Sequence, residues 1–369
     1  MHTNEDGLVI REPAQKAFFK SLNIKEKLEY FCLLGHLAPS SHNTQPWRFW
    51  IDEANVSITI YLNKDFILPA SDVDGRQATI SIGCATENII SGALYYGYLG
   101  TVEFLTDDKT KIKPSAQNEA LLIPIVKIKF QESNTDLPID TIQAIFNRKV
   151  TRAEYDPTKL ISNNILESIQ KLPDGEDTKL HLITDGLRRL SIAEFQSQAD
   201  AYVINSPKFS RELGDWLLPN NTKSCLGMPG IDFGLQDDEA ERLHNGLSGK
   251  SPLQPEDGLK FAMGGKIFIE KSPMIGIITT KKDDIENWIK AGEVFEKIFL
   301  ELTKQGIQVA VHAGITEVSL IKKIFSLTLG TNRYITVLFR AGYVKKEEDN
   351  KRPFSPRLPL KEILLSDKS

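Results

Sequence analysis

Two long helical patterns, each followed by a glycine, constrain the fold of this chain most strongly. The first covers about residues 78–98 and precedes Gly100, and the second covers 284–305 and precedes Gly306. A glycine just beyond the last periodic residue is a common end of a helix. Strand patterns accompany both long helices, so the order of elements repeats along the chain. The repeat predicts two α+β lobes fused in one protein.

The other predicted elements fit this division, with residues 1–135 as the first lobe and 136–369 as the second. Period-2 alternation and short apolar runs predict strands, and apolar positions three and four residues apart predict helices. The expected strands cover 47–52, 56–62, 121–130, 179–183, 274–280, 307–312 and 333–340, and the expected shorter helices cover 24–37, 140–148, 160–171 and 186–217.

Residues 221–265 break the pattern, because they hold eight of the 24 glycines and show little periodicity. A loop of this length in a compact protein is usually functional or mobile. The segment is therefore predicted to be a lid over a pocket, with a surface excursion or a partly disordered segment as the alternative.

The overall composition is that of a soluble globular protein. The chain is 41% apolar and 25% charged, with a net charge of −4, which gives no sign of a nucleic-acid partner. Residues 1–20 lack the apolar core of a signal peptide, and no run approaches the roughly 18 apolar residues of a membrane span. A cytoplasmic protein without a membrane partner is expected.

Metal and nucleotide motifs are largely excluded. Cys32, Cys84 and Cys225 are far apart with no C-x-x-C pair, so neither a disulfide framework nor a zinc cluster is expected. His36 and His312 are expected to be structural rather than metal ligands. The glycine fingerprint of a Rossmann site, the P-loop and the G-x-S-x-G nucleophile motif are all absent.

The stretch "APSSHNTQPWRFW", residues 38–50, carries more hydrogen-bonding side chains than a turn requires. Asn43 and Gln45 each offer a donor and an acceptor from one planar amide, which complements a heteroaromatic edge that alternates C=O, N–H and C=O. Pro39 and Pro46 restrict the loop backbone before any ligand arrives. The alternative is a loop whose polar side chains satisfy its own backbone.

The same stretch closely resembles the flavin-contacting segment of the nitroreductase superfamily, in which FMN lies at a dimer interface. Residues 74–100 resemble the Acg-type branch, whose chains carry two nitroreductase-like lobes fused together. The resemblance continues in the second half and covers nearly the whole chain. It rests there on "RKVTRAEYDP" (148–157), "GIQVAVHAGI" (306–315), "FRAGY" (339–343) and "SPRLPLKEIL" (355–364).

The resemblance implies a nitroreductase-like α+β fold, a mainly antiparallel sheet flanked by helices, with the two lobes as a pseudo-dimer. It also implies specific cofactor-binding residues and no catalytic acid or base. Gly314 would let the backbone approach the flavin near N5, and the arginines would face the phosphate. The implied contacts are Ser40, Ser41, Asn43 and Gln45 to the ring and its side chain, Arg148, Arg152 and Arg357 to the phosphate, and Gly314 to N5.

Three positions depart from the family pattern. Val150 stands where a hydroxyl usually contacts the phosphate, Ala313 replaces an acid beside the glycine, and Ser355 replaces a second cation. Thr151 is adjacent to Val150 but would point in a different direction. These departures concern phosphate binding and the handling of nicotinamide.

One FMN per chain is expected, because ring contacts lie in the first half and phosphate arginines in the second. The position that would complete a reciprocal site holds "LPDGEDTKLHL" (172–182), which lacks the Ser/Asn/Gln pattern. A monomer or a weak homodimer is expected.

Two functions follow from the resemblance. The first is an FMN-dependent oxidoreductase that takes a hydride from NAD(P)H and reduces a nitroaromatic, a quinone or a similar small molecule. The flavin would do this chemistry, so no catalytic base is needed. The alternative is an FMN-binding or storage protein with little turnover, in which residues 221–265 block access to the site. A third hypothesis is a decayed pair of lobes that binds no flavin.

Overall fold

The computed structural model describes residues 11–107, 110–115, 120–135 and 137–366 of the 369-residue chain. Residue 136, where the second lobe is predicted to begin, lies outside the described residues.

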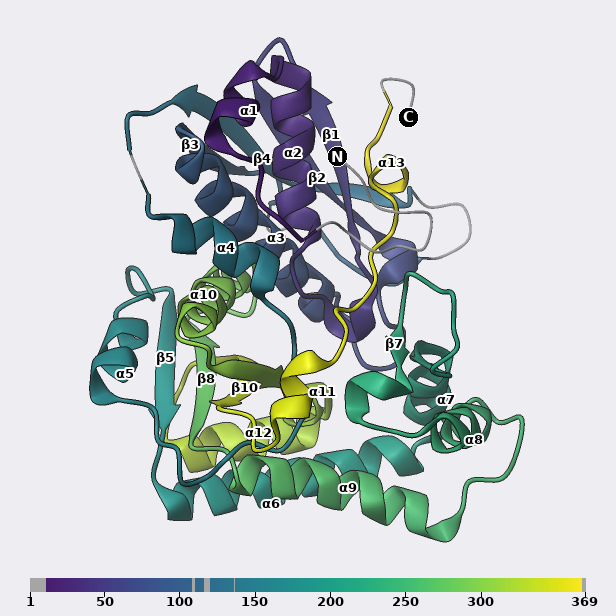
Figure 1. Ribbon diagram of the computed structural model, residues 1–369. Helices are drawn as coiled ribbons and strands as arrows, with labels where there is room; N and C mark the ends of the chain where they lie inside the picture. The colour runs from purple at the N-terminus through teal and green to yellow at the C-terminus, as the bar shows by residue number, and fades with distance from the viewer. Residues whose placement is uncertain (1–10, 108–109, 116–119, 136, 367–369) are drawn as a thin grey trace.

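Two four-stranded antiparallel sheets form the centres of two lobes (Figure 1). In the first sheet the order is β1-β2-β4-β3, and in the second it is β5-β8-β10-β9, so both sheets place their strands in the order first, second, fourth, third. The strands of the first sheet are β1 (Trp47–Asp52), β2 (Ser57–Asn63), β3 (Tyr98–Phe104) and β4 (Leu122–Glu132). Those of the second are β5 (Thr178–Ile183), β8 (Met274–Thr280), β9 (Gln308–Val311) and β10 (Tyr334–Gly342). The predicted α+β class and the fused double lobe are confirmed.

A long helix follows the second strand of each sheet. These helices are α3 (Arg76–Tyr95) and α10 (Ile285–Lys304), and each has 20 residues. They pack against each other between the sheets, where Gly83 and Gly292 occupy the eighth position of their helices (Figure 1). A methyl group added at Gly83 would lie 2.1 Å from the Ile289 carbonyl oxygen, and one added at Gly292 would lie 2.1 Å from the Ile80 carbonyl oxygen. The two glycines therefore permit the close crossing of the lobes.

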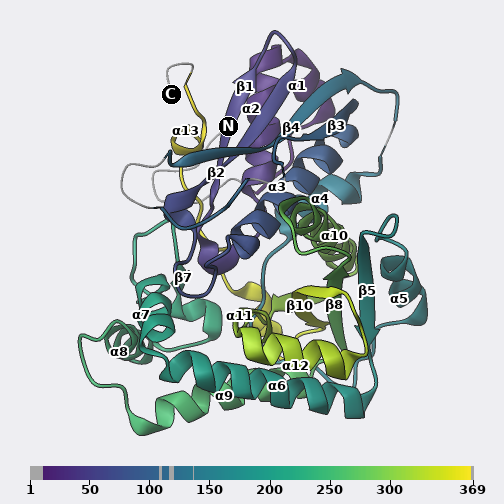
Figure 2. The same ribbon diagram turned by 180° about the vertical axis from the view of Figure 1, so that it is seen from behind.

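Several outer helices surround the lower lobe, which contains the second sheet, in both views (Figures 1 and 2). Two of them, α6 and α9, run side by side along the second sheet, and α7 and α8 lie beside them. The described helices other than α3 and α10 are α1 (Lys16–Ser21), α2 (Ile24–His36), α4 (Ile139–Asn147), α5 (Asn163–Gln170), α6 (Gly186–Asn205), α7 (Pro207–Trp216), α8 (Asp237–Leu247), α9 (Pro255–Glu270), α11 (Gly314–Glu317), α12 (Ser319–Leu329) and α13 (Leu360–Ile363).

The prediction of a long loop at residues 221–265 is wrong, because the segment contains α8 and the start of α9. Helix α8 has three acidic residues in its first turn, and α9 begins with a capping box of Gln254 and Asp257. Some of the glycines taken as loop signals serve helix packing: a methyl group at Gly265 would lie 2.1 Å from the Asp200 carboxylate of α6. Gly227, Gly234 and Gly249 lie outside the helices with positive φ.

The first long helix ends earlier than predicted. Gly97, with φ of +85°, follows its end, whereas Gly100 lies inside β3, a strand that the sequence pattern missed. Gly306, with φ of +67°, follows α10 as predicted.

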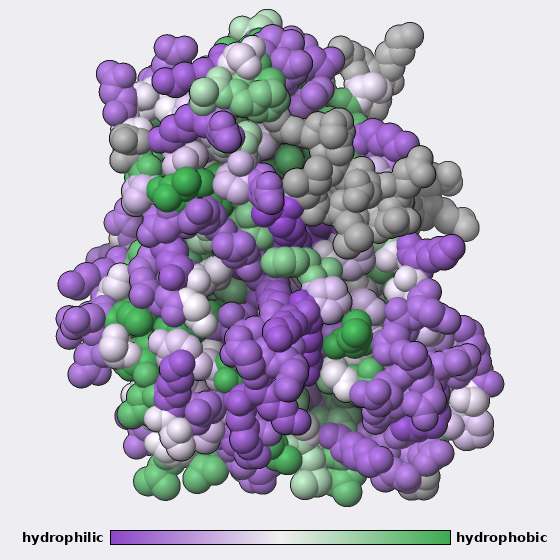
Figure 3. All heavy atoms as spheres, in the orientation of Figure 1, coloured by the Kyte–Doolittle hydropathy of each residue, from purple (hydrophilic) through white to green (hydrophobic). Residues whose placement is uncertain are grey.

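The surface in Figure 3 is mostly hydrophilic, with apolar atoms in small separate areas on this face. Among the described residues, no helix is long and apolar enough to cross a membrane.

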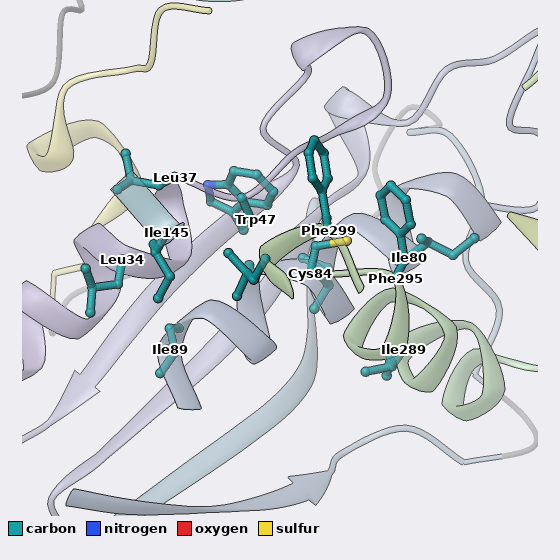
Figure 4. Packing of buried hydrophobic residues seen from close by; sticks show 14 of the residues in the cluster. Leu34, Leu37, Trp47, Ile80, Cys84, Ile89, Ile145, Ile289, Phe295 and Phe299 are labelled. Carbon is teal, nitrogen blue, oxygen red and sulfur yellow. The ribbon is translucent and has the colours of Figure 1, made fainter. Parts of the chain in front are cut away.

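One hydrophobic core spans both lobes. It joins side chains of α2, α3, α4 and α10, among them Leu34, Ile89, Ile145 and Phe299, around the indole of Trp47 (Figure 4). Trp47 and Phe299 are at most 1% exposed. The lobes therefore share their interior and are not two separately packed domains.

The C-terminal segment returns from the second lobe to the first (Figure 1). Leu364 pairs with Phe49 at the edge of β1, and the Leu365 amide donates to the Phe49 carbonyl at 2.8 Å. In the second lobe, Val150 pairs with Val309 beside β9. Backbone hydrogen bonds thus fix the two segments that the resemblance assigns to phosphate binding.

The crossing of α3 and α10 makes a prediction for Gly83→Ala. The added methyl group meets backbone atoms that cannot rotate away, so the free energy of unfolding should fall by about 1–3 kcal/mol. Urea denaturation measures this change. Gly264→Ala in α9 is the matched control, because nothing lies within 4 Å of its added methyl group. That change should stabilise the helix by up to about 1 kcal/mol. Equal stability of the two variants would contradict the proposed tight crossing.

Candidate functional site

A cavity of about 440 Å³ lies at the junction of the two lobes. Ser40 and Ser41 reach it from the loop that precedes β1, and Ser81 reaches it from α3. Arg152 and Gly314 reach it from the second lobe. A second cavity of about 30 Å³ adjoins the first, since Ser40 and Arg152 line both. The segments quoted from the two halves of the sequence therefore meet at one site.

The loop between α2 and β1 has a strained backbone. His42, Asn43 and Gln45 have φ values of 50°, 56° and 52°, a region that non-glycine residues seldom occupy. Gln45 donates its backbone N–H to the Ser40 hydroxyl at 3.0 Å, which helps to hold this conformation.

The amides of Asn43 and Gln45 bind neighbouring protein segments. The Gln45 side chain is fully buried; it donates to the Cys225 carbonyl at 2.7 Å and accepts from the Leu358 amide at 2.9 Å. Asn43 donates to the Pro356 carbonyl at 3.2 Å and lines the smaller cavity. Gln45 is not among the described residues that line either cavity. The two amides thus tie the loop to the C-terminal segment and to the segment that precedes β7 (Met228–Pro229).

Arg357 is bonded to the same loop. Its guanidinium donates to the carbonyls of His36, Leu37 and Ala38 at 2.9–3.2 Å and to Asn43 Oδ1 at 2.9 Å. These carbonyls belong to the end of α2, where a cation is favoured by the helix dipole. Burial and the nearby Arg148 lower the pKa of Arg357 to about 9.

Arg148 forms a buried ion pair. Its Nε lies 3.0 Å from the carboxylate of Glu296 on α10, and it also donates to the Leu37 carbonyl. Burial raises the pKa of Glu296 to about 7, while the Arg148 charge opposes that rise. Removal of either partner would leave the other in the core, which usually costs about 3–5 kcal/mol.

Arg152 is the predicted arginine that reaches both cavities. It donates to the Met228 sulfur at 3.4 Å, a weak acceptor, and lies 4.6 Å from the centre of the Phe233 ring. Burial lowers its pKa, and the charge of Asp232 acts in the opposite direction. Among the three predicted arginines, Arg152 therefore has the weakest contacts with the protein.

The smaller cavity is strongly basic. Twelve described residues line it, and they include five cations and no carboxylate. Burial is the main cause that lowers the pKa of Arg11 well below its usual value, and repulsion from Arg357 and Arg148 adds to the shift. The five cations are Arg11, Arg148, Lys149, Arg152 and Arg357.

The replacement of a family hydroxyl by Val150 has a structural counterpart. Val150 lines both cavities with an apolar side chain. The neighbouring Thr151 hydroxyl donates to Gln308 Oε1 at 2.7 Å and is buried. Thr151 therefore does not supply the missing hydroxyl to the cavity.

Gly314 begins α11 beside two polar side chains of α6. A methyl group at this position would lie 2.7 Å from Gln196 Nε2 and 2.9 Å from Asp200 Oδ1. The absence of a side chain therefore leaves room for this polar pair at the cavity wall. At the same cavity, the Ser41 hydroxyl donates to Gln77 Oε1 at 2.7 Å, which holds the serine in place.

Two carboxyl groups in the cavity were not predicted from the sequence. Burial, with a further contribution from Glu317, raises the pKa of Asp200 to about 8, while a 2.7 Å hydrogen bond from Gln196 opposes the shift. Burial likewise raises the pKa of Glu317 to about 7, and Gln77 donates to it at 3.0 Å. Both groups can hold a proton near neutral pH. Only their packing against α3, α9 and α11 distinguishes them from ordinary helical acids.

Arg340 and His312 form another pair that the sequence did not indicate. Burial and the charge of Arg340 hold the pKa of His312 well below its usual value, so its neutral ring accepts from Arg340 Nε at 2.9 Å. His36 is also neutral, because burial is the main cause that lowers its pKa to about 3. Its ring accepts from Trp47 Nε1 at 2.9 Å and donates to the Leu358 carbonyl at 2.8 Å. No group of three or more metal-binding side chains occurs within the part of the chain that the structure describes.

The segment 221–265 forms one wall of the larger cavity. Met228 and Phe233 lie at the Arg152 side, and residues from α8 and α9 continue the wall. The predicted covering segment is thus placed beside the site as packed helices.

Comparisons with known proteins find relatives in Mycobacterium tuberculosis strain ATCC 25618 / H37Rv. "Uncharacterized protein Rv3127" is 24% identical over 280 residues, 74% of either chain. "Putative NAD(P)H nitroreductase acg" is 21% identical over 330 residues, 88% of this chain and 91% of that one. "Putative NAD(P)H nitroreductase Rv3131" is 23% identical over 328 residues, 89% of this chain and 88% of that one.

The chain is similar to Acg-type proteins of the nitroreductase superfamily. The resemblance stated from residues 38–49 and 74–100 is thereby confirmed. No protein-family model matches the chain.

A comparison with solved structures finds the FMN-dependent nitroreductase NfnB from Mycobacterium smegmatis in complex with NADPH. That structure has a TM-score of 0.41 and 14% sequence identity, and the match covers 62% of this chain and 98% of NfnB.

The raised pKa of Asp200 predicts a pH-dependent stability. An unfolded Asp ionises near pH 4, whereas this group ionises at about 8 in the folded protein, so the folded state holds the extra proton between these values. The stability contribution is full below about pH 4 and is lost as the pH rises toward 8, by up to about 1.4 kcal/mol per pH unit.

Asp200→Asn should therefore flatten the decrease in unfolding free energy between pH 5 and 8, measured by urea denaturation at several pH values. Glu167→Gln replaces an exposed carboxylate on α5 and should keep the wild-type profile. A profile of Asp200→Asn parallel to that of the wild type would contradict the raised pKa.

Proposed function

We propose that the protein is an FMN-dependent NAD(P)H oxidoreductase of the nitroreductase type, with the cofactor held across the two lobes. The observation that carries this proposal is the basic cavity beside the larger one, at the meeting point of the loop 38–46 and residues 148–152. Two of the curated relatives carry NAD(P)H nitroreductase in their names, which supports the same activity.

The residues present fit the phosphate of FMN at the smaller cavity. Five cations line this cavity without a carboxylate. Arg148 among them is paired with Glu296, and an anion in the cavity would relieve the repulsion among the others. Arg152 would bind the phosphate directly, because its present contacts are a sulfur atom and an aromatic face. Arg148 and Arg357 would contribute charge while they hold the end of α2 in place.

The larger cavity fits the ring and its polar side chain. Ser40 and Ser41 would hydrogen-bond the ribityl chain and the ring edge, and Gly314 would allow a close approach of the backbone. We assign Asn43 and Gln45 to the same site as residues that shape the loop through their bonds to the C-terminal segment.

The bound flavin would accept a hydride from NAD(P)H and pass two electrons to a small-molecule acceptor. The chain itself would orient the ring and exclude water through the apolar wall of α8 and α9. Asp200 and Glu317 would hold protons at the cavity wall, where reduction of an acceptor consumes them.

One chain would hold one FMN. The segment between α5 and β5 is the positional counterpart of the loop between α2 and β1, and it carries no serine, asparagine or glutamine from residue 172 to 177. Both parts of the proposed site come from one chain, so we expect a monomer or a weak homodimer.

Arg152→Met tests the proposed phosphate contact. The loss of a charge-assisted hydrogen bond costs about 1.5–3 kcal/mol, so the dissociation constant for FMN should rise roughly 10–150-fold. Fluorescence titration of FMN against the flavin-free protein measures this constant. Arg188→Met, an exposed change at the start of α6, should leave it unaltered. Unchanged FMN affinity in Arg152→Met would refute this role.

A second candidate is an FMN-binding or storage protein with little turnover. It is favoured by the contacts of Met228 and Phe233 with Arg152, since these residues of the segment 221–265 lie over the basic end of the site. Residues of the same segment also line the larger cavity, where a wall closed over the ring would deny a nicotinamide the space to stack.

Anaerobic reduction distinguishes the two candidates. We expect NADPH or NADH to bleach the visible flavin band of the FMN-loaded protein within seconds to minutes. Dithionite serves as the control that any bound flavin can be reduced. Bleaching by dithionite alone would contradict the oxidoreductase and support storage, and failure to retain FMN would contradict both.

A further inference from the structure

The larger cavity extends into an apolar region away from the loop 38–46. A separate hydrophobic cluster of the protein is centred on Ile204, Leu217 and Leu247. These three residues also line the cavity, as do Leu213, Leu243 and Phe261, which pack against the same cluster. We call the part of the cavity lined by these six residues the apolar annex.

The annex is open space where a packed core is expected. Protein interiors are normally close-packed, and voids larger than a water molecule are few. Here most members of a hydrophobic cluster surround a cavity, and an apolar cavity of this kind is destabilising unless something fills it.

Polar contacts connect the helices that form the walls of the annex. Arg242 of α8 forms a two-pronged ion pair with Asp257 of α9, at 2.7 and 2.9 Å. The His244 ring of α8 lies 3.0 Å from the Gly214 carbonyl and 2.9 Å from the Leu217 carbonyl. A methyl group at Gly214 would lie 2.3 Å from the Ser248 amide, so α7 and α8 are in close contact. The annex is therefore a preformed pocket, as ligand sites usually are.

The two ends of the cavity differ in chemistry. Ser40, Ser41 and Arg152 lie at the end proposed for the flavin. Six aliphatic and aromatic side chains define the annex, and the charged residues Glu239, Asp257 and Lys260 of α8 and α9 also line the cavity. A ligand that spans both ends needs a compact redox-active ring and a hydrocarbon extension. A small polar nitroaromatic would leave the annex unfilled.

We propose that the annex binds the aliphatic side chain of a quinone, whose ring is then the electron acceptor at the flavin end. The electron-transfer part rests on the proposed function, but the binding part does not. In the reaction, NAD(P)H, one proton and the quinone give NAD(P)⁺ and the hydroquinone. The hydride supplies two electrons and one proton, and the second proton comes from solvent, through the carboxyl groups of Asp200 and Glu317 at the cavity wall.

Isothermal titration of 2-methyl-1,4-naphthoquinone and its 3-alkyl derivatives against the oxidised, FMN-loaded protein tests the binding without turnover. Each added CH₂ buries more apolar surface, so affinity should rise about fourfold per carbon for the first few carbons. Affinity that does not change with chain length would overturn the proposal.

Two variants that fill the annex provide the specificity test. Gly264→Leu adds a side chain where nothing lies within 4 Å of the new Cβ, and Leu243→Trp enlarges a lining residue. Either should abolish the gain with chain length and leave the affinity of the unalkylated quinone unchanged. Leu259→Trp is the control, because Leu259 is 63% exposed on the same helix, α9. A chain-length effect that persists in both filled variants would show nonspecific partitioning and overturn the proposal.

The outcomes separate this inference from the proposed function. If alkylated quinones bind with chain-length dependence but NADPH never reduces them, the proposed annex is supported and the proposed oxidoreductase activity is contradicted. If NADPH reduces short quinones and the chain length has no effect on affinity, the proposed oxidoreductase activity is supported and the proposed annex is contradicted. If the protein retains no FMN, the same titration on the flavin-free chain still tests the annex.

Discussion

The contact between α3 and α10 through Gly83 and Gly292 is the constraint on which the arrangement of this protein depends. At this crossing two backbones meet at distances that a side chain would prevent. The glycines occupy equivalent positions in equivalent helices, so the contact relates the lobes as two halves of a pseudo-dimer. Because the crossing fixes the lobes, the loop before β1 faces residues 148–152 and the start of α11, and a cavity forms between them.

The polar residues around this cavity divide between support and binding. Arg357, Asn43, Gln45 and His36 connect the end of α2 to the C-terminal segment through buried hydrogen bonds. Such a buried network must be complete, because each unpaired member would carry the full cost of its desolvation. Arg148 is likewise held by its buried ion pair with Glu296, whereas Arg152 has weaker protein partners, a sulfur atom and an aromatic ring. Arginine, asparagine and glutamine are residue types typical of ligand contacts, but here several of them hold the loop in place instead.

The helices α7, α8 and α9 add a wall that the duplicated core does not supply. Their apolar side chains surround space, and an ion pair and a close glycine contact connect the three helices. The same segment thus covers the basic end of the site at Met228 and Phe233 and opens an annex at Leu243 and Phe261. The first feature favours the hypothesis that the segment blocks the flavin site, and the second favours the hypothesis that it forms part of a substrate pocket.

Local patterns were sufficient to predict most strands and the long helices, because alternation and 3.6-residue spacing reflect which face of an element is buried. They failed at residues 221–265, where glycines that pack α9 against α6 looked like loop residues, and at Gly100, which lies within β3. They also missed Asp200, Glu317 and the Arg340–His312 pair, since burial, the largest cause, and neighbours from other elements give these common residues their unusual pKa values.

The sequence by itself determined the double-lobed α+β fold and the segments that form the site, because periodicity and a resemblance over nearly the whole chain are local properties of the residues. Tertiary structure alone decided which polar groups face the cavity and which are used within the protein. That choice depends on contacts between residues up to about 320 positions apart, such as Arg357 with His36, and no local pattern records them.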